Sequence, residues 1–239
     1  FMAIAGINFA LHFSAWRRAS AQPYFSDPEL KVYAVLLLSF AVLVSFALYL
    51  TGTYDSLSSS FRYGFFQVIS ALTTTGFTTA PFYEWTGFLP VTLICIAFIG
   101  GCAGSTAGGM KVIRIILLYK QSIREVRRLI HPHAVIPIKV GGQRTSDTVI
   151  SAVWGFFFLF IASFAVMTVL LTATGLDAET AYSAVGACIT NLGPALGDAG
   201  PNYASLNDPA KVILSFAMLL GRLEVYTLLV ILTPAIWRD

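Results

Sequence analysis

Long apolar runs along this chain predict helices that cross a membrane. The run Val32–Leu50 contains no charged residue over 19 positions, which is enough for a helix to span roughly 30 Å of hydrocarbon. Three further runs, Trp85–Cys102, Val149–Thr174 and Val212–Ile236, are similarly apolar over most of their length. These four runs form the predicted scaffold of the chain.

Two other apolar runs are too short to cross, and each ends in a loop that contains glycine. Phe61–Thr73 leads into Thr-Thr-Gly-Phe, and Ala178–Ile189 leads into Thr-Asn-Leu-Gly-Pro. A short helix that stops inside the membrane is tolerated only where the following loop is buried or lines water. Backbone carbonyls and Thr hydroxyls in such a loop supply oxygens that replace the hydration shell of K⁺. We therefore predict a cation selectivity filter, in preference to an ordinary Thr-rich turn.

Each loop is expected to contribute four consecutive residues to the filter, where they bind the potassium ion. These residues are Thr74, Thr75, Gly76 and Phe77 in the first loop, and Asn191, Leu192, Gly193 and Pro194 in the second. Because Pro194 lacks an amide hydrogen and Asn191 takes the place of a threonine, we expect the second loop to be less regular. The assembled filter should then be less rigidly fourfold than that of a homotetrameric channel.

The unit of long helix, short helix, glycine loop and long helix occurs twice. A spacing of 117 residues relates Gly76 to Gly193 and Thr73 to Thr190, and internal duplication is common in transporters. Two loops alone would leave half of the ion's coordination shell empty. The missing loops come from a second copy of the chain or from an N-terminal half. The run Ala3–Phe13, interpreted as the tail of an earlier membrane helix, favours the N-terminal half.

A glycine-rich segment interrupts the run that follows the first loop. Packing of a continuous helix through G-x-x-x-G is one interpretation. Each glycine disfavours helix by about 1 kcal/mol relative to alanine, so we prefer an unwound segment that stands in the ion path and moves. The residues assigned to this gate are Gly100, Gly101, Gly104, Ser105, Thr106, Gly108 and Gly109.

Arg222 is a second gating candidate, because it lies within the last apolar run. An arginine at mid-membrane costs roughly 2.5–3.5 kcal/mol on insertion scales and marks a functional site by default. The repeat spacing matches Arg222 to Ser105, at the depth of the glycine-rich segment. We expect a fixed positive charge below the filter, held by carbonyls of the mobile loop. The alternative is a buried Arg–Glu pair with another helix.

Composition and charge indicate a membrane protein and set its orientation. Hydrophobic residues make up 56% of the chain and charged residues 11%, whereas soluble domains carry about 25% charged residues. Lys and Arg residues concentrate on one side of the predicted spans, above all in the linker 111–147, which places that side in the cytoplasm. Acidic residues such as Asp55, Glu84 and Asp177 fall on the opposite side. The short helices therefore enter from outside.

Other kinds of chemistry have little support in the sequence. Cys95, Cys102 and Cys188 lie in apolar segments and are expected to be buried thiols, and His131-Pro-His133 is expected to be a loop rather than a metal site. The glycine-rich segment does not match a phosphate-binding loop, so nucleic acid is not an expected partner. An intramembrane enzyme is disfavoured because the spans carry no histidine and no paired carboxylates.

Several motifs in order resemble the TrkH family of the bacterial Trk/Ktr/HKT potassium-uptake superfamily. They are Ser70–Thr79, Gly100–Arg114, Thr190–Pro194, Gly221–Glu224 and Thr233–Arg238. The resemblance implies four repeats around one pore, of which this chain carries the third and fourth. It implies that the glycine-rich segment is an intramembrane gating loop and that Arg222 helps to occlude the path. It also implies a homodimer in the bacterial inner membrane and a cytoplasmic nucleotide-binding partner similar to TrkA.

Together these observations predict an all-α polytopic membrane protein with tandem helix–pore helix–filter loop–helix repeats around an ion pore. Its parts are expected to be a helix end and cytoplasmic link at 1–30, a pore repeat at 31–120, a basic linker at 121–147 and a second pore repeat at 148–239. The predicted function is K⁺ uptake, with K⁺ as the transported ion and no cofactor in this chain. A non-conducting receptor or assembly subunit is the alternative.

Overall fold

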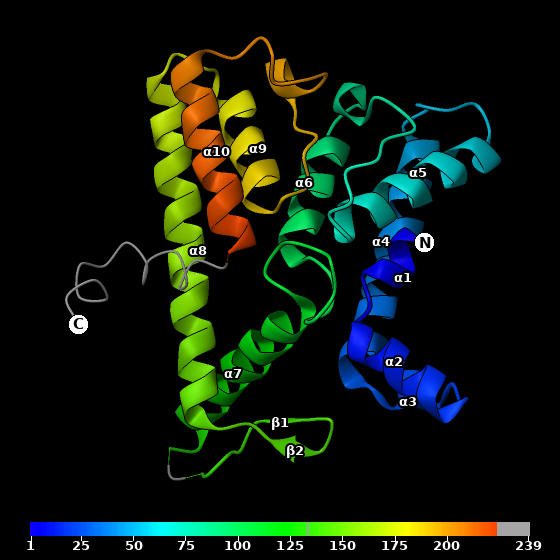
Figure 1. Ribbon diagram of the computed structural model, residues 1–239, viewed down its shortest axis with the longest axis vertical. Helices are drawn as coiled ribbons and strands as arrows, with labels where there is room; N and C mark the ends of the chain where they lie inside the picture. The colour runs from blue at the N-terminus through cyan, green and yellow to red at the C-terminus, as the bar shows by residue number, and fades with distance from the viewer. Residues whose placement is uncertain (133, 224–239) are drawn as a thin grey trace.

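The computed structural model describes residues 1–132 and 134–223, and its architecture is helical, as predicted (Figure 1). The elements are α1 (Met2–Ala5), α2 (Phe9–Arg18), α3 (Gln22–Ser26), α4 (Pro28–Leu50), α5 (Leu57–Leu72), η1 (Phe82–Glu84), α6 (Leu89–Ile99), α7 (Val112–Ile130), β1 (Lys139–Val140), β2 (Gln143–Arg144), α8 (Asp147–Ala173), α9 (Ala178–Ile189), η2 (Gly197–Ala199) and α10 (Asp208–Arg222). The strands form one antiparallel hairpin. His133 and Glu224–Asp239, with the end of the predicted run Val212–Ile236 and the motif Thr233–Arg238, lie outside the described residues.

Helix α4 shows how the apolar runs become membrane helices. The Asp27 side chain accepts the Leu30 N–H at 2.7 Å and Pro28 occupies the first turn, so the helix starts there. A stripe that includes Tyr33, Ala41 and Val44 is buried, mainly against α5. Apolar side chains on the other faces of α4 remain exposed, which suits contact with hydrocarbon and not with water.

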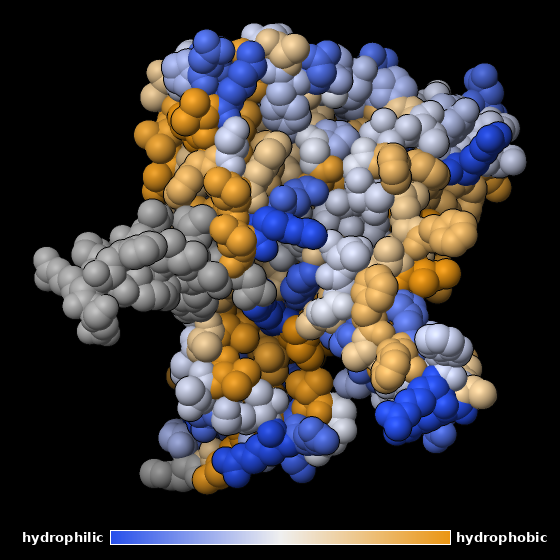
Figure 2. Space-filling view, in the orientation of Figure 1, coloured by the Kyte–Doolittle hydropathy of each residue, from blue (hydrophilic) through white to orange (hydrophobic). Residues whose placement is uncertain are grey.

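Two helices of the described chain, α4 and α8, are long and apolar enough to cross a membrane. Figure 2 shows the same distribution on the surface, with apolar atoms along α8 and α10 and polar atoms at both ends of the molecule. This surface pattern agrees with the membrane protein expected from the composition.

The two predicted repeats lie side by side (Figure 1). Short helix α5 packs on α4, and short helix α9 packs between α8 and α10. Helix α6 of the first repeat contacts α9 of the second, where Gly186 leaves room for the Ile94 and Phe98 side chains. Most buried apolar residues of both repeats form one core, and a smaller cluster of Leu117, Ile138, Ile150 and Val153 lies apart from it.

Two segments differ from the sequence prediction. The run Ala3–Phe13 is not one helical tail, because the chain breaks between α1 and α2. Asn8 caps α2 there by accepting the Ala10 N–H at 2.9 Å. Helix α7 runs on to Ile130, past the boundary predicted at residue 120, because Ile116, Leu117 and Arg124 on one face are buried in this part of the structure.

Candidate functional site

The two loops after α5 and α9 have the same backbone conformation. Thr74 (φ 49°) and Asn191 (φ 57°), 117 residues apart, are both left-handed, and so are Gly76 (φ 79°) and Gly193 (φ 99°). Left-handed backbone is uncommon for residues other than glycine. The same unusual backbone therefore recurs at two equivalent positions of each loop.

Hydrogen bonds at the base of the loops repeat with the same spacing. The Thr74 N–H donates to the Ala71 carbonyl at 3.1 Å, and the Asn191 N–H donates to the Cys188 carbonyl at 3.0 Å. The next amide in each loop donates to the carbonyl five residues before it. The Thr75 N–H donates to Ser70 at 2.9 Å, and the Leu192 N–H donates to Ala187 at 2.8 Å. Backbone geometry is therefore duplicated although the side chains differ.

Most filter carbonyls are left without a protein donor. Within the described residues, no hydrogen bond is accepted by the carbonyls of the predicted filter residues Thr74 to Phe77. In the second loop, the Gly193 carbonyl differs, because it accepts the Tyr203 hydroxyl at 2.5 Å. Burial raises the pKa of Tyr203, so the hydroxyl keeps the proton that it donates. The expected irregularity of the second loop thus has one physical source that the sequence analysis missed.

The two loops touch each other at Gly76. A side chain at this position would collide with the Leu192 carbonyl, so only glycine fits. Gly193, by contrast, has open space around it in this chain and lines a cavity of about 520 Å³ with Thr78, Thr79 and other residues. Neither glycine is sealed in side-chain packing, since both are partly exposed.

Residues 100–111 leave the helix and return to almost the same point. The Met110 N–H donates to the Phe98 carbonyl at 2.9 Å, and the Val112 N–H donates to the Gly101 carbonyl at 3.0 Å. Helix α7 therefore begins beside the end of α6. The segment is a loop and not a continuous helix packed through G-x-x-x-G. Gly100, Gly104 and Gly109 all have positive φ, which accounts for the density of glycine.

The tip of this loop lies against the base of both filter loops. The Gly108 N–H donates to Oγ1 of Thr74 at 2.6 Å. A side chain at Gly108 would collide with the Thr190 carbonyl. In the second repeat, Gly221 meets the Ile189 carbonyl in the same close way. The predicted gate residues are thus directly adjacent to the predicted filter.

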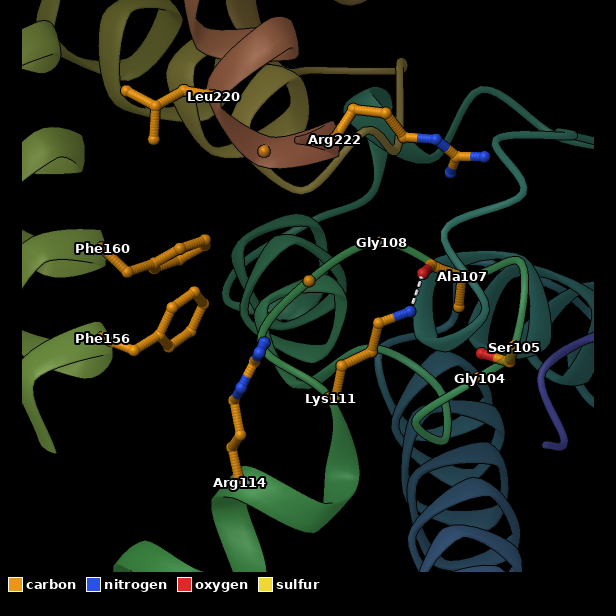
Figure 3. A pocket seen from close by; sticks show the side chains of 12 residues that line it. Gly104, Ser105, Ala107, Gly108, Lys111, Arg114, Phe156, Phe160, Leu220 and Arg222 are labelled. Carbon is orange, nitrogen blue, oxygen red and sulfur yellow. Dashed lines mark hydrogen bonds between the residues drawn. The ribbon is translucent and has the colours of Figure 1, made fainter. Parts of the chain in front are cut away.

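Arg222 reaches this loop from the end of α10. Its Nη1 donates to the Thr106 carbonyl at 3.2 Å, the kind of contact expected from the sequence. Arg222 lines a cavity of about 260 Å³. Its other lining residues include Lys111, which precedes α7, Arg114 of α7, and Phe156 and Phe160 of α8, and Figure 3 shows these side chains around it. The alternative, a buried ion pair between Arg222 and a glutamate of another helix, does not occur among the described residues.

Basic and aromatic groups complete the walls of this cavity. The Lys111 ammonium donates to the Ala107 carbonyl within the loop. The Arg114 guanidinium lies 4.1 Å from the centroid of the Phe156 ring, a cation–π contact that joins α7 to α8. Sequence reasoning assigned these two residues only to the basic side of the membrane. Their place in the wall of this cavity was not visible from charge alone, because the partners include a backbone carbonyl and an aromatic ring.

Comparison with known proteins identifies the family of this chain. The sequence model of a family described as "TrkH: Cation transport protein" matches residues 1–238. This chain belongs to the TrkH family. The TrkH family and the relatives below are transporters and not enzymes, so the idea of an intramembrane enzyme is set aside.

Individual TrkH relatives match the whole of this chain. The Trk system potassium uptake protein TrkH of Halomonas elongata is 50% identical over 238 residues, which are 100% of this chain and 49% of that protein. TrkH of Escherichia coli K12 is 46% identical over 239 residues, or 100% of this chain and 50% of that protein. The crystal structure of the potassium transporter TrkH from Vibrio parahaemolyticus superposes with a TM-score of 0.94 at 45% identity, covering 100% of this chain and 51% of that one. The chain thus spans about half the length of these TrkH proteins.

Proposed function

We propose that this chain supplies two quadrants of the selectivity filter of a K⁺ uptake protein. The observation that carries the proposal is the duplicated loop backbone: left-handed residues at 74 and 76 recur at 191 and 193. Seven of the eight filter carbonyls accept no hydrogen bond from the described residues, so they are available to replace water around an ion. The filter residues are Thr74–Phe77 and Asn191–Pro194.

The gate of this pathway is the loop 100–111 together with Arg222. The loop stands directly under the filter, and its Thr106 carbonyl accepts a hydrogen bond from Arg222. A guanidinium at this depth opposes the passage of a cation by direct repulsion. Opening then requires the loop to move away from the filter and to release or carry the arginine.

Two more quadrants are needed to surround the ion, and they come from an N-terminal half of the same protein. Support for this comes from the half-length coverage of the TrkH relatives and from the open space around Gly193. The complete protein is a multi-pass homodimer in the bacterial inner membrane, in contact with lipid. Its basic cytoplasmic side, rich in Lys and Arg on α7, docks a nucleotide-binding regulatory subunit similar to TrkA.

Flux measurements on the full-length protein test this function. Reconstituted in liposomes, it should take up Rb⁺ and reject Li⁺, and residues 1–239 alone should pass neither ion. Absence of Rb⁺ flux from well-folded full-length protein would instead favour the non-conducting receptor or assembly subunit. Conduction by residues 1–239 alone would contradict the need for two further quadrants.

A further inference from the structure

A buried carboxylate lies at the root of the loop 100–111. Glu29 is in the first turn of α4, and only 7% of its surface is exposed. One of its oxygens, Oε1, accepts two backbone hydrogen bonds: from the Ala103 N–H at 2.7 Å and from the Ile113 N–H at 3.0 Å. Neither donor is near Glu29 in the sequence.

These two donors flank the loop on its two sides. Ala103 lies near the start of the loop, and Ile113 is the second residue of α7, just after its end. One oxygen atom from a different helix therefore ties both ends of the loop together. The tie is independent of the contact at the tip, where the Gly108 N–H donates to Thr74.

One amide in the first turn of α7, that of Ile113, donates to this carboxylate. The N-cap residue of α7, Lys111, makes no side-chain capping bond, whereas most helices satisfy their first amides with a local Ser, Thr, Asp or Asn. Glu29 supplies the missing acceptor from α4. Both hydrogen bonds need an oxygen atom at this reach from α4, which is the property that the position requires.

We propose that Glu29 is a positioning residue for the gate: it fixes both ends of the loop 100–111 and thereby holds the closed conformation. This inference rests on the proposed function of that loop. Without the acceptor, two amides with no other hydrogen-bond acceptor in the described structure would have to find new partners, and the loop would leave its place under the filter.

Three substitutions of Glu29 in the full-length protein distinguish the effect of its side-chain length from the effect of its charge. Glu29→Gln keeps an oxygen at the same distance and should behave like the wild type. Glu29→Asp keeps the charge but is one methylene shorter, and Glu29→Ala removes the acceptor. Both should raise resting Rb⁺ leak in liposomes, Glu29→Ala by about tenfold. Asp27→Ala, which removes the cap of the same helix without touching the loop, is the matched control.

Hydrogen exchange measured on the same proteins reads the loop directly. Amides in peptides covering 100–113 should exchange faster in the Asp and Ala variants and not in the Gln variant or the control. The proposal would be overturned if hydrogen exchange were unchanged in both the Asp and the Ala variants. It would also be overturned if resting Rb⁺ leak rose in the Gln variant and stayed at the wild-type level in the Asp variant. Faster exchange with unchanged leak would leave the hold of Glu29 on the loop intact and reject the loop as the gate. If Glu29→Ala does not fold, the Gln and Asp variants still decide.

Discussion

The two pore repeats share a filter backbone but continue differently below it. After the first filter loop the chain forms α6, the excursion 100–111 and α7. After the second it forms α10, which remains helical up to Arg222. The first repeat therefore brings a loop to the base of the filter and the second brings a charged side chain. The repeats share the loop that we propose to hold the ion and differ below it, so each repeat supplies one half of the proposed gate.

The strongest test of the shared part is Gly76→Ala. A methyl group there collides with the Leu192 carbonyl and also strains a left-handed backbone. We expect Rb⁺ uptake by the full-length protein to fall by about a hundredfold or more. Gly87→Ala is the control, because Gly87 has a similar φ of +71° with nothing within 4 Å. Equal uptake by the two variants would show that contact between the filter loops is unimportant.

Arg222→Ala tests the part that differs. Loss of the guanidinium removes both the bond to the Thr106 carbonyl and the repulsion of a cation below the filter. Resting Rb⁺ leak should rise by about tenfold. Arg62→Ala, an exposed arginine on α5, should leave the leak unchanged. Normal expression with wild-type leak in Arg222→Ala would mean that the arginine is structural.

Tyr203→Phe tests an asymmetry in hydrogen bonding between the two filter loops. The Tyr203 hydroxyl holds the Gly193 carbonyl, while no described group holds the carbonyl of Gly76. Release of the Gly193 carbonyl should change the ratio of K⁺ to Na⁺ uptake by about threefold to tenfold, with total uptake little altered. Tyr49→Phe, on the partly exposed surface of α4, is the control. An unchanged ratio would show that the Gly193 carbonyl does not set selectivity.

The smallest expected effect concerns the outer ends of the short helices. Hydrogen bonds from the Thr180 side chain and backbone lower the pKa of Asp177, the cap of α9, whereas the cap of α5 is the neutral Ser56. Because the pKa of Asp177 is lowered on folding, the charged cap stabilises the fold at pH values above the ordinary pKa of 3.8. This stabilisation is lost as the pH falls through the lowered pKa of the folded state.

Because Asp177 is solvent-exposed, the loss should be at most about 1 kcal/mol. Thermal unfolding of the wild type and Asp177→Asn from pH 6 to pH 3 measures it. The difference between the two should shrink on acidification. A difference that stays constant would show that the charge of Asp177 contributes nothing to the cap.

Much of this fold follows from local sequence patterns. Charge-free runs identify α4 and α8, because a helix in hydrocarbon tolerates few charges. The loops at Gly76 and Gly193 and the break at 100–109 were predictable, because glycine marks backbone that other residues disfavour. The extent of α7 was missed, since its amphipathic sequence has the polarity of a linker and gains its buried face only from packing.

The contacts that position the gate were not predictable in the same way. Glu29 and Ala103 are 74 residues apart, and an acidic residue in the first turn of a helix ordinarily indicates a local contribution to the helix end. Tyr203 was equally hidden, since its partner is a backbone carbonyl with no signature in the sequence. Burial and partner identity are properties of the tertiary structure, so these residues became visible only in three dimensions.

The loop 100–111 leaves the end of α6 and returns beside it, where Met110 bonds to Phe98 and Val112 bonds to Gly101. This closure has a mechanical consequence. Because the two ends of the loop 100–111 are hydrogen-bonded beside each other, we expect the segment between them to rearrange once its bonds to Glu29 and Thr74 are released, while α6 and α7 stay where they are. Permeation would then be switched by rearranging a handful of peptide units, without tilting or sliding any helix through the surrounding lipid.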